Sequence, residues 1–532
     1  MKAYAHNERV MSCILDDKAR TVGSKVFVRH HEDKVTYEGL SAGATRIANF
    51  LIRELGVKSQ DKVAVILPNC VHFFFAQFGI AKAGAVMVSV NVQAKLELLT
   101  HFLNNSDAET VIVDEQFVPL LRSIEAAIPR VKTLIVRSPG SKPVTFPARF
   151  RLIPFQELFS GPSTPVERRA DWCDPVDIFY TSGTTGVSKG VVLSHNHHYT
   201  FGLAIASNSR VGADDVMYIC LPLYHGMGSY MSIMPMLLCE GSIGLGDRFS
   251  ASRWLSEIRE YGATVTWAVY SMAPILLKQP ERPDDADNPL RVYLFSGMPP
   301  DVVEPFEKRF GLKVIESYGA TESADIAHSL WDKKKRGAVG PINSEYYDIK
   351  IVNEWDEEVP VGEVGECVSR CKYPYTQMTE YYKMPEETVK TFRNRWLHSG
   401  DMCRVDEEGW LYFVGRGKDT IRRRGENISC YELETILSAC DGVLECASIP
   451  VPSSLGEDDV KVVVALREGK VLTYREIMVY CEEKMPKFMI PRYIELVKAV
   501  PKLPNEKVDK ERLKRESLTP TTWDAETGGL VT

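Results

Sequence analysis

The 532-residue chain has no strong excess of charge of either sign and no long apolar run. Its 64 Lys and Arg residues nearly balance 71 Asp and Glu residues, which gives a formal net charge of -7 at pH 7. This balance argues against nucleic acid or an anionic membrane surface as a partner. The most apolar stretch, residues 71–92, is interrupted by His72, Gln77, Lys82 and Asn91. We therefore expect no export signal, no integral membrane span and a cytoplasmic location.

CxxC pairs are also absent. The twelve cysteines lie at irregular positions, and the closest two, Cys367 and Cys371, do not form a CxxC motif. Reduced, buried thiols are therefore expected rather than a disulfide framework or a zinc ribbon. The cluster of His195, His197 and His198 has no carboxylate or cysteine spaced with it, so no metal site is expected there.

Hydrophobic patterning predicts an α/β architecture for most of the chain. From about residue 60 to 350, short β-branched runs such as 62–67 and 292–296 alternate with amphipathic stretches such as 251–261 and 300–310. Strand runs that are apolar throughout are typical of parallel sheets covered by helices on both faces. A large α/β N-terminal domain with parallel-rich sheets is therefore expected over residues 1–417.

The pattern changes after about residue 409. A hairpin-like run at 410–415 is followed by expected strands near 446–451, 461–466 and 493–500 and by a helix at 474–484. This order predicts a small α+β domain over residues 418–515. The polar stretch 516–532 is expected to be a loose tail.

The most informative segment is the glycine- and hydroxyl-rich stretch at residues 179–190. It joins an apolar strand at 176–180 to a second apolar run at 191–193. Glycines let a backbone approach a polyphosphate closely, hydroxyls donate hydrogen bonds to it, and a lysine adds charge. The residue types therefore predict a phosphate-binding loop, although the spacing is not that of a Walker A motif. A surface linker would rarely separate two apolar strands.

This loop and seven further segments resemble the adenylate-forming superfamily, which includes acyl-CoA synthetases, firefly-type luciferases and nonribosomal-peptide adenylation domains. The further segments, in the family's order, are residues 221–226, 296–299, 318–323, 398–401, 415–419, 424–429 and 501–507. The sequence of residues 425–434 is most similar to the crotonobetaine/carnitine-CoA ligase group of acyl-CoA synthetases.

The resemblance implies a reaction in two steps. A carboxylate attacks the α-phosphate of ATP, pyrophosphate leaves, and the thiol of CoA then opens the acyl-AMP. The implied ligands are ATP, Mg²⁺, CoA and a small-molecule carboxylic acid. Whether the protein forms a homodimer is left open. Lys418 is implied to be the hinge on which the small domain turns between the two steps.

The resemblance also assigns residues to roles. On the phosphates, the assigned residues are Thr181, Ser182, Gly183, Thr184, Thr185 and Lys189 for the β- and γ-phosphates and Thr321 for the α-phosphate. Tyr318 is assigned to one face of adenine, and the loop with Gly297, Met298 and Pro299 to the other; Gly319 and Ala320 are further nucleotide-binding residues. Asp401 and Arg416 are assigned to the ribose. Glu322 is assigned to Mg²⁺, His225 to the acyl gate, Gly425 to the thioester step and Lys507 to adenylation. Glu506 stands where the family usually has glycine, and Lys502 and Lys510 are nearby substitutes for Lys507.

The expected acyl pocket includes Tyr224, Trp267, Tyr270 and Asp325. Trp267 and Tyr270 replace residues that are usually a small residue and a proline, so a short or medium acid is favoured over a long fatty acid. Together with Asp325 these aromatic rings could also receive a cationic acid. The alternatives are an adenylation enzyme that loads a carrier protein, a luciferase-like oxidation and a non-catalytic nucleotide-binding regulator.

Overall fold

The computed structural model divides into two compact units, each described here by itself. The described residues are 1–94, 96–138, 149–181, 188–269, 272–295, 300–416, 420–423, 426–453, 458–485, 487, 489–503 and 507–531. Of these, unit 1 contains residues up to 348 together with 369–397, and unit 2 contains residues 349–368 and 398–531. Unit 2 therefore includes residues that the sequence pattern assigns to the large domain. The predicted hinge, Lys418, lies outside the described residues.

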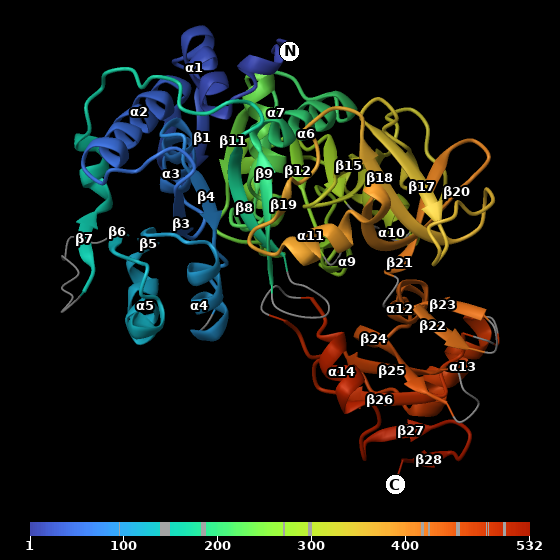
Figure 1. The fold of residues 1–532 in the computed structure, drawn as a ribbon. Helices are drawn as coiled ribbons and strands as arrows, with labels where there is room; N and C mark the ends of the chain where they lie inside the picture. The colour runs from blue at the N-terminus through green and yellow to red at the C-terminus, as the bar shows by residue number, and fades with distance from the viewer. Residues whose placement is uncertain are drawn as a thin grey trace. The chain divides into compact units, whose positions relative to one another are not determined.

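Two eight-stranded sheets form unit 1 (Figure 1). The first has the order β19-β9-β8-β4-β3-β5-β6-β7, and its strands from β8 to β7 are parallel. Its bounds are β3 Lys62–Ile66, β4 Val86–Ser89, β5 Thr110–Asp114, β6 Thr133–Arg137, β7 Arg151–Pro154, β8 Pro175–Thr181, β9 Lys189–Ser194 and β19 Glu380–Tyr381. Every residue of β4 and β5 is buried, as expected for strands covered on both faces.

The second sheet has the order β15-β14-β13-β12-β10-β11-β1-β2, with parallel strands between antiparallel edges. The bounds of its strands are β1 Val26–His30, β2 Asp33–Thr36, β10 Val216–Ile219, β11 Ser242–Leu245, β12 Val265–Trp267, β13 Val292–Phe295, β14 Lys313–Ala320 and β15 Ala324–His328. The short strand β16, Gly340–Pro341, is not a strand of either eight-stranded sheet. These two sheets confirm the predicted parallel-rich α/β class.

Helices connect and cover these strands. Their bounds in unit 1 are η1 His6–Glu8, α1 Met11–Val22, α2 Tyr37–Arg53, α3 Val71–Lys82, α4 Leu96–Asn105, η2 Glu115–Phe117, α5 Val118–Ser123, η3 Glu125–Ala127, η4 Phe155–Ser160, α6 His195–Asn208, α7 Tyr230–Cys239, α8 Trp254–Tyr261, α9 Met272–Leu277, α10 Pro300–Phe310, α11 Pro385–Thr391 and η5 Arg393–Arg395. The predicted helix at 300–310 coincides with α10, and α8 occupies most of the one predicted at 251–261.

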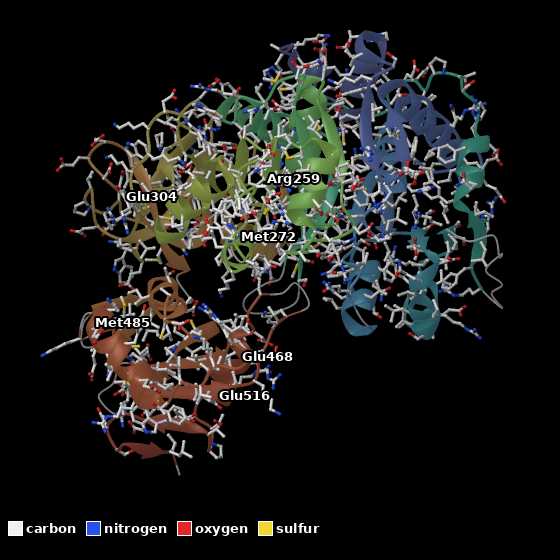
Figure 2. The ribbon with its side chains drawn as sticks, turned by 180° about the vertical axis from the view of Figure 1, so that it is seen from behind. Arg259, Met272, Glu304, Glu468, Met485 and Glu516 are labelled. Atoms are coloured by element: carbon white, nitrogen blue, oxygen red, sulfur yellow. The ribbon has the colours of Figure 1, made fainter. Side chains whose placement is uncertain are left out.

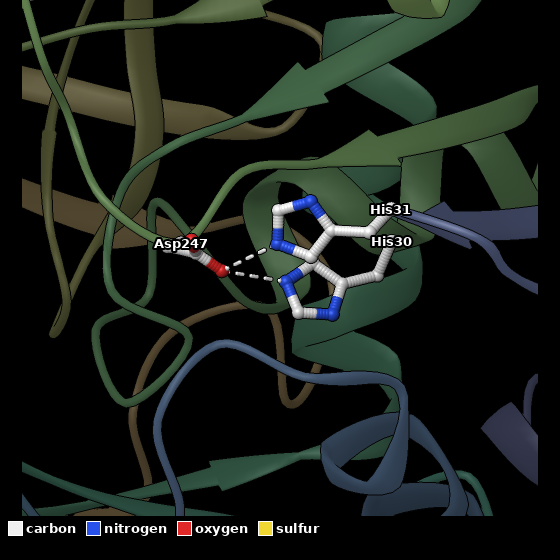
Figure 3. A group of neighbouring side chains, drawn as sticks. All are labelled: His30, His31 and Asp247. Atoms are coloured by element: carbon white, nitrogen blue, oxygen red, sulfur yellow. Dashed lines mark hydrogen bonds and ion pairs between the residues drawn. The ribbon is translucent and has the colours of Figure 1, made fainter.

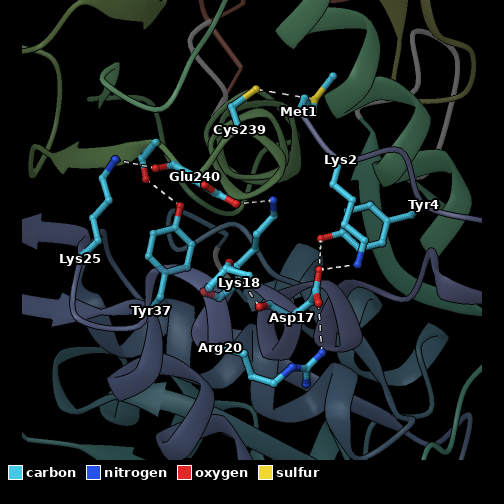
Figure 4. A network of polar contacts seen from close by, with 12 residues as sticks. Met1, Lys2, Tyr4, Asp17, Lys18, Arg20, Lys25, Tyr37, Cys239 and Glu240 are labelled. Carbon is cyan, nitrogen blue, oxygen red and sulfur yellow. Dashed lines mark hydrogen bonds and ion pairs between the residues drawn. The ribbon is translucent and has the colours of Figure 1, made fainter.

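Polar contacts tie the N-terminal helices to the end of α7 (Figure 4). Nζ of Lys18 lies 2.9 Å from Oε1 of Glu240, and Lys25 donates to the carbonyl of Glu240 at 2.6 Å. The hydroxyl of Tyr37, which is fully buried, donates to the carbonyl of Gly241 at 2.7 Å. The bonds from Lys25 and Tyr37 satisfy carbonyls at the helix end, where no intrahelical donor is available.

Unit 2 combines three β structures. One sheet contains β17 Tyr347–Val352, β18 Gly365–Cys371, β20 Leu397–Val405 and β21 Trp410–Arg416; a hairpin joins β22 Thr420–Arg423 to β23 Glu426–Ser429; and a second sheet contains β24 Val443–Pro452, β25 Asp458–Leu466, β26 Tyr493–Val497, β27 Thr522–Asp524 and β28 Gly529–Leu530. Its helices are α12 Cys430–Ser438, α13 Tyr474–Lys484 and α14 Lys510–Glu516. The core between α12, α13 and this second sheet includes Met485, which Figure 2 labels.

The prediction of a loose tail over 516–532 is wrong for the described residues. Strand β27 pairs with β26, and β28 pairs with β27. The ring of Trp523 stacks on that of Tyr474 with centroids 5.7 Å apart, and Arg492 donates to both carboxylate oxygens of Asp524 at 3.2 and 3.1 Å. The polar tail is ordered because its side chains find partners on β26 and α13.

No helix in the part of the chain that the structure describes has the length and apolar character needed to cross a membrane.

Replacing Trp523 with Ala should destabilise unit 2 by about 2 kcal/mol, because the substitution removes the stacked pair and its buried apolar area. The matched control is Trp355→Ala in the same unit, since Trp355 is 76% exposed and should change stability by no more than about 0.5 kcal/mol. Calorimetric unfolding of both variants measures the difference. Equal effects of the two substitutions would contradict a structural role for the tail.

Candidate active site

The two ends of the predicted phosphate loop lie side by side at the end of a buried sheet. Strands β8 and β9 are antiparallel, and Thr181 faces Lys189 across the pair. Strand β8 is parallel to β4, so the loop leaves the carboxyl edge of the parallel strands, where ligands bind in open α/β sheets. The loop residues Ser182, Gly183, Thr184 and Thr185 lie outside the described residues.

A segment almost two hundred positions further along the chain covers the base of this loop. Strand β19 pairs with the edge of β9, and the backbone N–H of Tyr382 donates to the carbonyl of Gly190 at 2.7 Å. Lys189 forms an ion pair with Glu387 of α11. Its Nζ also lies 4.8 Å from the ring centroid of Tyr381, within cation–π range.

The same tyrosine contacts Glu322, the residue predicted to hold Mg²⁺. The Tyr381 hydroxyl donates to Oε1 of Glu322 at 2.9 Å, and the backbone N–H of Met378 donates to the Glu322 carbonyl at 2.8 Å. Burial and the neighbouring Glu322 carboxylate raise the pKa of Tyr381, so the hydroxyl remains a donor at neutral pH. Tyr381 thus links the lysine and the carboxylate that the sequence predicts for phosphate and metal.

Sequence reasoning did not find Tyr381 or Glu387. Neither residue lies in the eight segments that carry the resemblance, and a tyrosine beside a second tyrosine, Tyr382, does not by itself indicate a site. Only the pairing of β19 with β9 identifies them.

The tight connection between β14 and β15 carries four predicted nucleotide residues, of which Tyr318 is buried and Thr321 is half-buried. Gly319 is required there because a Cβ at this position would lie 1.7 Å from the carbonyl oxygen of Ala324 on the facing strand. The backbone N–H of Ala320 donates to the hydroxyl of Ser323 at 3.0 Å and closes the turn. This geometry holds Thr321 and Glu322 at the end of the hairpin.

Asp325 and Trp267, both predicted to line the acyl pocket, are buried and have polar partners within the protein. The hydroxyl of Ser317 donates to Oδ1 of Asp325 at 2.5 Å, and Nδ1 of His328 lies 3.0 Å from Oδ2. The indole N–H of Trp267 donates to the Met231 carbonyl at 3.2 Å. The contacts give Asp325 a structural role, and its assignment to the substrate remains a prediction. Tyr270 lies outside the described residues.

The predicted gate residue, His225, is half-buried in the segment before α7. Its ring lies 4.7 Å from the ring of Tyr224, with planes tilted by 52°. Tyr224 is 8% exposed, so the pair has one ring in the protein interior and the other near its surface. The structure thus brings these two predicted residues together.

A buried polar cluster includes Asp177 of β8. The ring of His198 stacks on that of Tyr230, with centroids 4.4 Å apart and planes at 6°. Nε2 of His198 lies 3.5 Å from Oδ2 of Asp177. Burial raises the pKa of Asp177 well above its usual range and lowers that of His198, which favours the neutral form of both groups. His195 instead accepts a hydrogen bond from the Met11 N–H at 3.3 Å.

Two predicted ribose-binding residues face each other in unit 2. Asp401 of β20 and Arg416 of β21 are cross-strand partners, and Asp401 is 3% exposed. The hydroxyl of Ser399 accepts a hydrogen bond from the Asp401 N–H at 3.1 Å and donates to the Cys367 carbonyl at 2.6 Å. The strand register therefore places the two residues opposite each other, and their assignment to the ribose stays a prediction.

Lys507, the predicted adenylation lysine, is exposed in unit 2. Its carbonyl accepts a hydrogen bond from the Leu503 N–H at 2.7 Å. The two predicted substitutes for Lys507 each form an ion pair. Nζ of Lys502 lies 2.8 Å from Oε2 of Glu445, and Nζ of Lys510 lies 2.9 Å from Oε1 of Glu434. The predicted residues Gly297, Met298, Pro299, Gly425 and Glu506 lie outside the described residues.

Comparison with known proteins assigns the chain to a family. The sequence profile of the AMP-binding enzyme family matches residues 15–382, and that of the AMP-binding enzyme C-terminal domain matches residues 432–507. Because the first match alone covers more than half of the chain, the protein belongs to the AMP-binding enzyme family, and it is an enzyme of the AMP-forming acid–thiol ligase class.

Its relatives and structural neighbours are adenylate-forming ligases. Crotonobetaine/carnitine–CoA ligase of Citrobacter koseri is 30% identical over 512 residues, which cover 94% of this chain and 98% of the relative. The Salmonella typhimurium enzyme of the same name is 31% identical over 496 residues, with 90% and 93% covered. ATP-bound MatB from Rhodopseudomonas palustris has a TM-score of 0.85 at 25% identity, with 95% and 98% covered. An anthranilate CoA ligase with bound anthranoyl-AMP shares the fold, with a TM-score of 0.86 at 24% identity and coverage of 97% and 98%.

Replacing Gly319 with Ala should destabilise unit 1 by about 1–3 kcal/mol, because the new methyl group cannot fit against the backbone of Ala324 without opening the hairpin. Gly212→Ala is the matched control in the same unit, since a Cβ there would meet only Oδ2 of Asp215, at an ordinary contact distance of 3.9 Å. Urea denaturation measures both variants. A Gly319→Ala protein as stable as the wild type would show that this hairpin is not tightly constrained.

Proposed function

We propose that the protein is an ATP-dependent acyl-CoA ligase that acts on a short or medium carboxylic acid. It forms an acyl-adenylate and pyrophosphate, and then transfers the acyl group to CoA with release of AMP. The family assignment and CoA ligase relatives across more than nine-tenths of the chain support this proposal. The observation that carries it is the linkage of Lys189 and Glu322 through Tyr381 at the base of the phosphate loop.

In the first step, a carboxylate oxygen of the acid forms a bond to the α-phosphorus of ATP. The bond between that phosphorus and the oxygen bridging to the β-phosphate breaks, and pyrophosphate takes the electron pair. Lys189 neutralises charge on the leaving phosphates, and Thr321 donates to the α-phosphate. We assign Lys507 the role of stabilising the negative charge that accumulates on the α-phosphate and the attacking oxygen. In a site shielded from water, such a stabilisation lowers the barrier by about 3–4 kcal/mol.

In the second step, the thiolate sulfur of CoA attacks the acyl carbon and AMP leaves with the electrons of the acyl–phosphate bond. Asp401 accepts hydrogen bonds from the ribose hydroxyls, and Tyr318 provides an aromatic face for adenine. Gly425 serves the thioester step, and Lys418 serves as the hinge. These roles all depend on positioning rather than on a covalent enzyme intermediate.

The donor set around Glu322 fits Mg²⁺, which prefers one or two carboxylates together with substrate phosphate oxygens. Tyr381 donates to Oε1, and no described residue donates a hydrogen bond to Oε2. Mg²⁺ bound there would offset negative charge on the phosphates during transfer. Glu322 would hold the ion, and Tyr381 would orient the carboxylate.

Exchange of labelled pyrophosphate into ATP should depend on the added acid. We expect butyrate or octanoate to support faster exchange than palmitate, because the buried Trp267 leaves little depth for a long chain. A panel of acetate, butyrate, octanoate, palmitate, coumarate and crotonobetaine, with CoA thioester formation measured in parallel, tests this order. Fastest turnover of palmitate would contradict the short pocket, and no exchange with any acid would contradict the proposed function.

Lys507→Ala is the variant that separates the two steps in this assay. It should abolish pyrophosphate exchange but leave thioester formation from supplied acyl-AMP largely intact. Lys502→Ala is the matched control because Lys502 is held by Glu445 in the same unit. Unchanged exchange in Lys507→Ala would assign the adenylation charge to another residue.

Tyr381→Phe should raise the Mg²⁺ concentration required for half-maximal exchange by about tenfold, because Glu322 loses the hydroxyl that orients it. Tyr382→Phe is the matched control, since its hydroxyl donates to a different carboxylate, that of Asp107, at 3.1 Å. Exchange rates measured over a range of Mg²⁺ concentrations compare the two. A shift of the same size in both variants would remove the metal-positioning role from Tyr381.

A further inference from the structure

Two adjacent histidines and one aspartate converge at a point on unit 1 outside the proposed catalytic machinery (Figure 3). Nε2 of His30 lies 2.8 Å from Oδ1 of Asp247, and Nε2 of His31 lies 3.0 Å from the same oxygen. The three potential ligand atoms all lie within 4.8 Å of one another.

The backbone explains how neighbouring residues come to share one side. Successive side chains of a strand point to opposite faces, so a second histidine after the end of β1 would normally point away from the first. His31 has φ of 51°, in the left-handed region, and this conformation ends the strand and turns the second ring beside the first. The ring centroids are 4.3 Å apart.

Sheet topology supplies the carboxylate. Strand β11 is parallel to β1, with Val28 facing Ile243 and Arg29 facing Gly244. The chain leaves both strands at the same edge of the sheet, and Asp247 follows two residues after β11 ends. The convergence of the three side chains is therefore built into the strand order.

The donor set is that of a transition-metal site. Two imidazole nitrogens and one carboxylate oxygen suit Zn²⁺, Ni²⁺ or Co²⁺, whereas Mg²⁺ and Ca²⁺ prefer oxygen ligands alone. Metal–ligand bonds of about 2.0–2.1 Å in a tetrahedron place ligands about 3.4 Å apart. The two distances from Nε2 to Oδ1 of Asp247, 2.8 and 3.0 Å, are slightly shorter than this. The His30 side chain is 11% exposed and holds its position, whereas His31 and Asp247 are 57% and 49% exposed and can adjust.

The surroundings also favour a cation. Asp33 on β2 is the cross-strand partner of His30, and Glu32 lies in the turn between the strands. The nearby Arg29 is engaged elsewhere, since it donates to Glu260 at 3.1 Å and lies over the ring of Tyr261. The exposed side of the cluster leaves room for water as a further ligand.

We propose that His30, His31 and Asp247 form a surface binding site for a divalent transition-metal ion, with both Nε2 atoms and one Asp247 oxygen as ligands. On binding, the two Nε2 lone pairs face the ion, and the ring protons reside on Nδ1. The site does not depend on the proposed ligase activity, because none of its three residues has a role in that reaction.

The test is titration of the full-length, tag-free protein with ZnCl₂, NiCl₂ or CoCl₂ after treatment with EDTA and its removal. Isothermal calorimetry and the visible absorption of bound Co²⁺ report the affinity. We expect His31→Gln and Asp247→Asn each to weaken binding by at least about tenfold. His6→Gln, which removes an exposed histidine elsewhere in unit 1, should leave the affinity unchanged.

The comparison with these variants separates this site from binding by the chain's cysteines. Circular dichroism checks that each variant is folded, and NMR of the wild-type protein gives an independent reading, since Ni²⁺ should broaden the His30 and His31 ring signals before those of His6. Unchanged affinity in both site variants, selective broadening of other histidines, or no saturable binding up to about 1 mM metal would overturn the proposal.

Discussion

Backbone pairing of β19 with β9 is the constraint on which the candidate site of unit 1 depends. The pairing places Tyr381 opposite Val191 and aligns the following N–H with the carbonyl of Gly190. Because side chains alternate along a strand, a slip of one residue would turn Tyr381 to the opposite face. Both Lys189 and Glu322 would then lose their shared neighbour. A short two-residue strand therefore fixes the relation between segments that are far apart in the sequence.

The interactions at this point differ in how readily a ligand could replace them. Lys189 and Glu387 have side chains 21% and 34% exposed, and a partly exposed ion pair contributes only about 0–1 kcal/mol. Under the proposed function, a phosphate would therefore take the lysine from Glu387 at little cost. The hydrogen bond from the buried Tyr381 to Glu322 is harder to replace because its donor is shielded from water. The proposed function requires this difference, since the lysine would be released to a phosphate while the carboxylate kept its orientation.

Periodicity predicted the framework of the fold well, because each element has its own local signal. The predicted helix at 474–484 coincides with α13, and the predicted strands at 62–67 and 292–296 correspond to β3 and β13. Local signals cannot identify partners, and this explains the failures. The tail was read as loose from its polar composition, yet the hydroxyls of Thr519 and Thr521 donate to Glu495 at 2.5 and 2.7 Å.

The same limit applies to the site. The resemblance located Lys189 and Glu322 because both lie in recognisable segments, whereas Tyr381 and Glu387 carry no local pattern and depend on sheet pairing. Asp325 shows the converse case. Its place in the chain suggested a pocket carboxylate, but only the structure reveals that Ser317 and His328 already engage both of its oxygens.

These contacts bear on the choice of acid. Several relatives are named for acids that carry a quaternary ammonium group, and such a group is held by exposed aromatic faces or by a carboxylate with acceptor capacity to spare. In this chain Asp325 is 1% exposed and engaged, and Trp267 is 1% exposed with its indole N–H bonded to Met231. Freeing Asp325 for a cation would leave the buried hydroxyl of Ser317 without its acceptor, a cost of about 1–3 kcal/mol. The packing around Asp325 and Trp267 therefore favours the proposed short or medium acid over a cationic one.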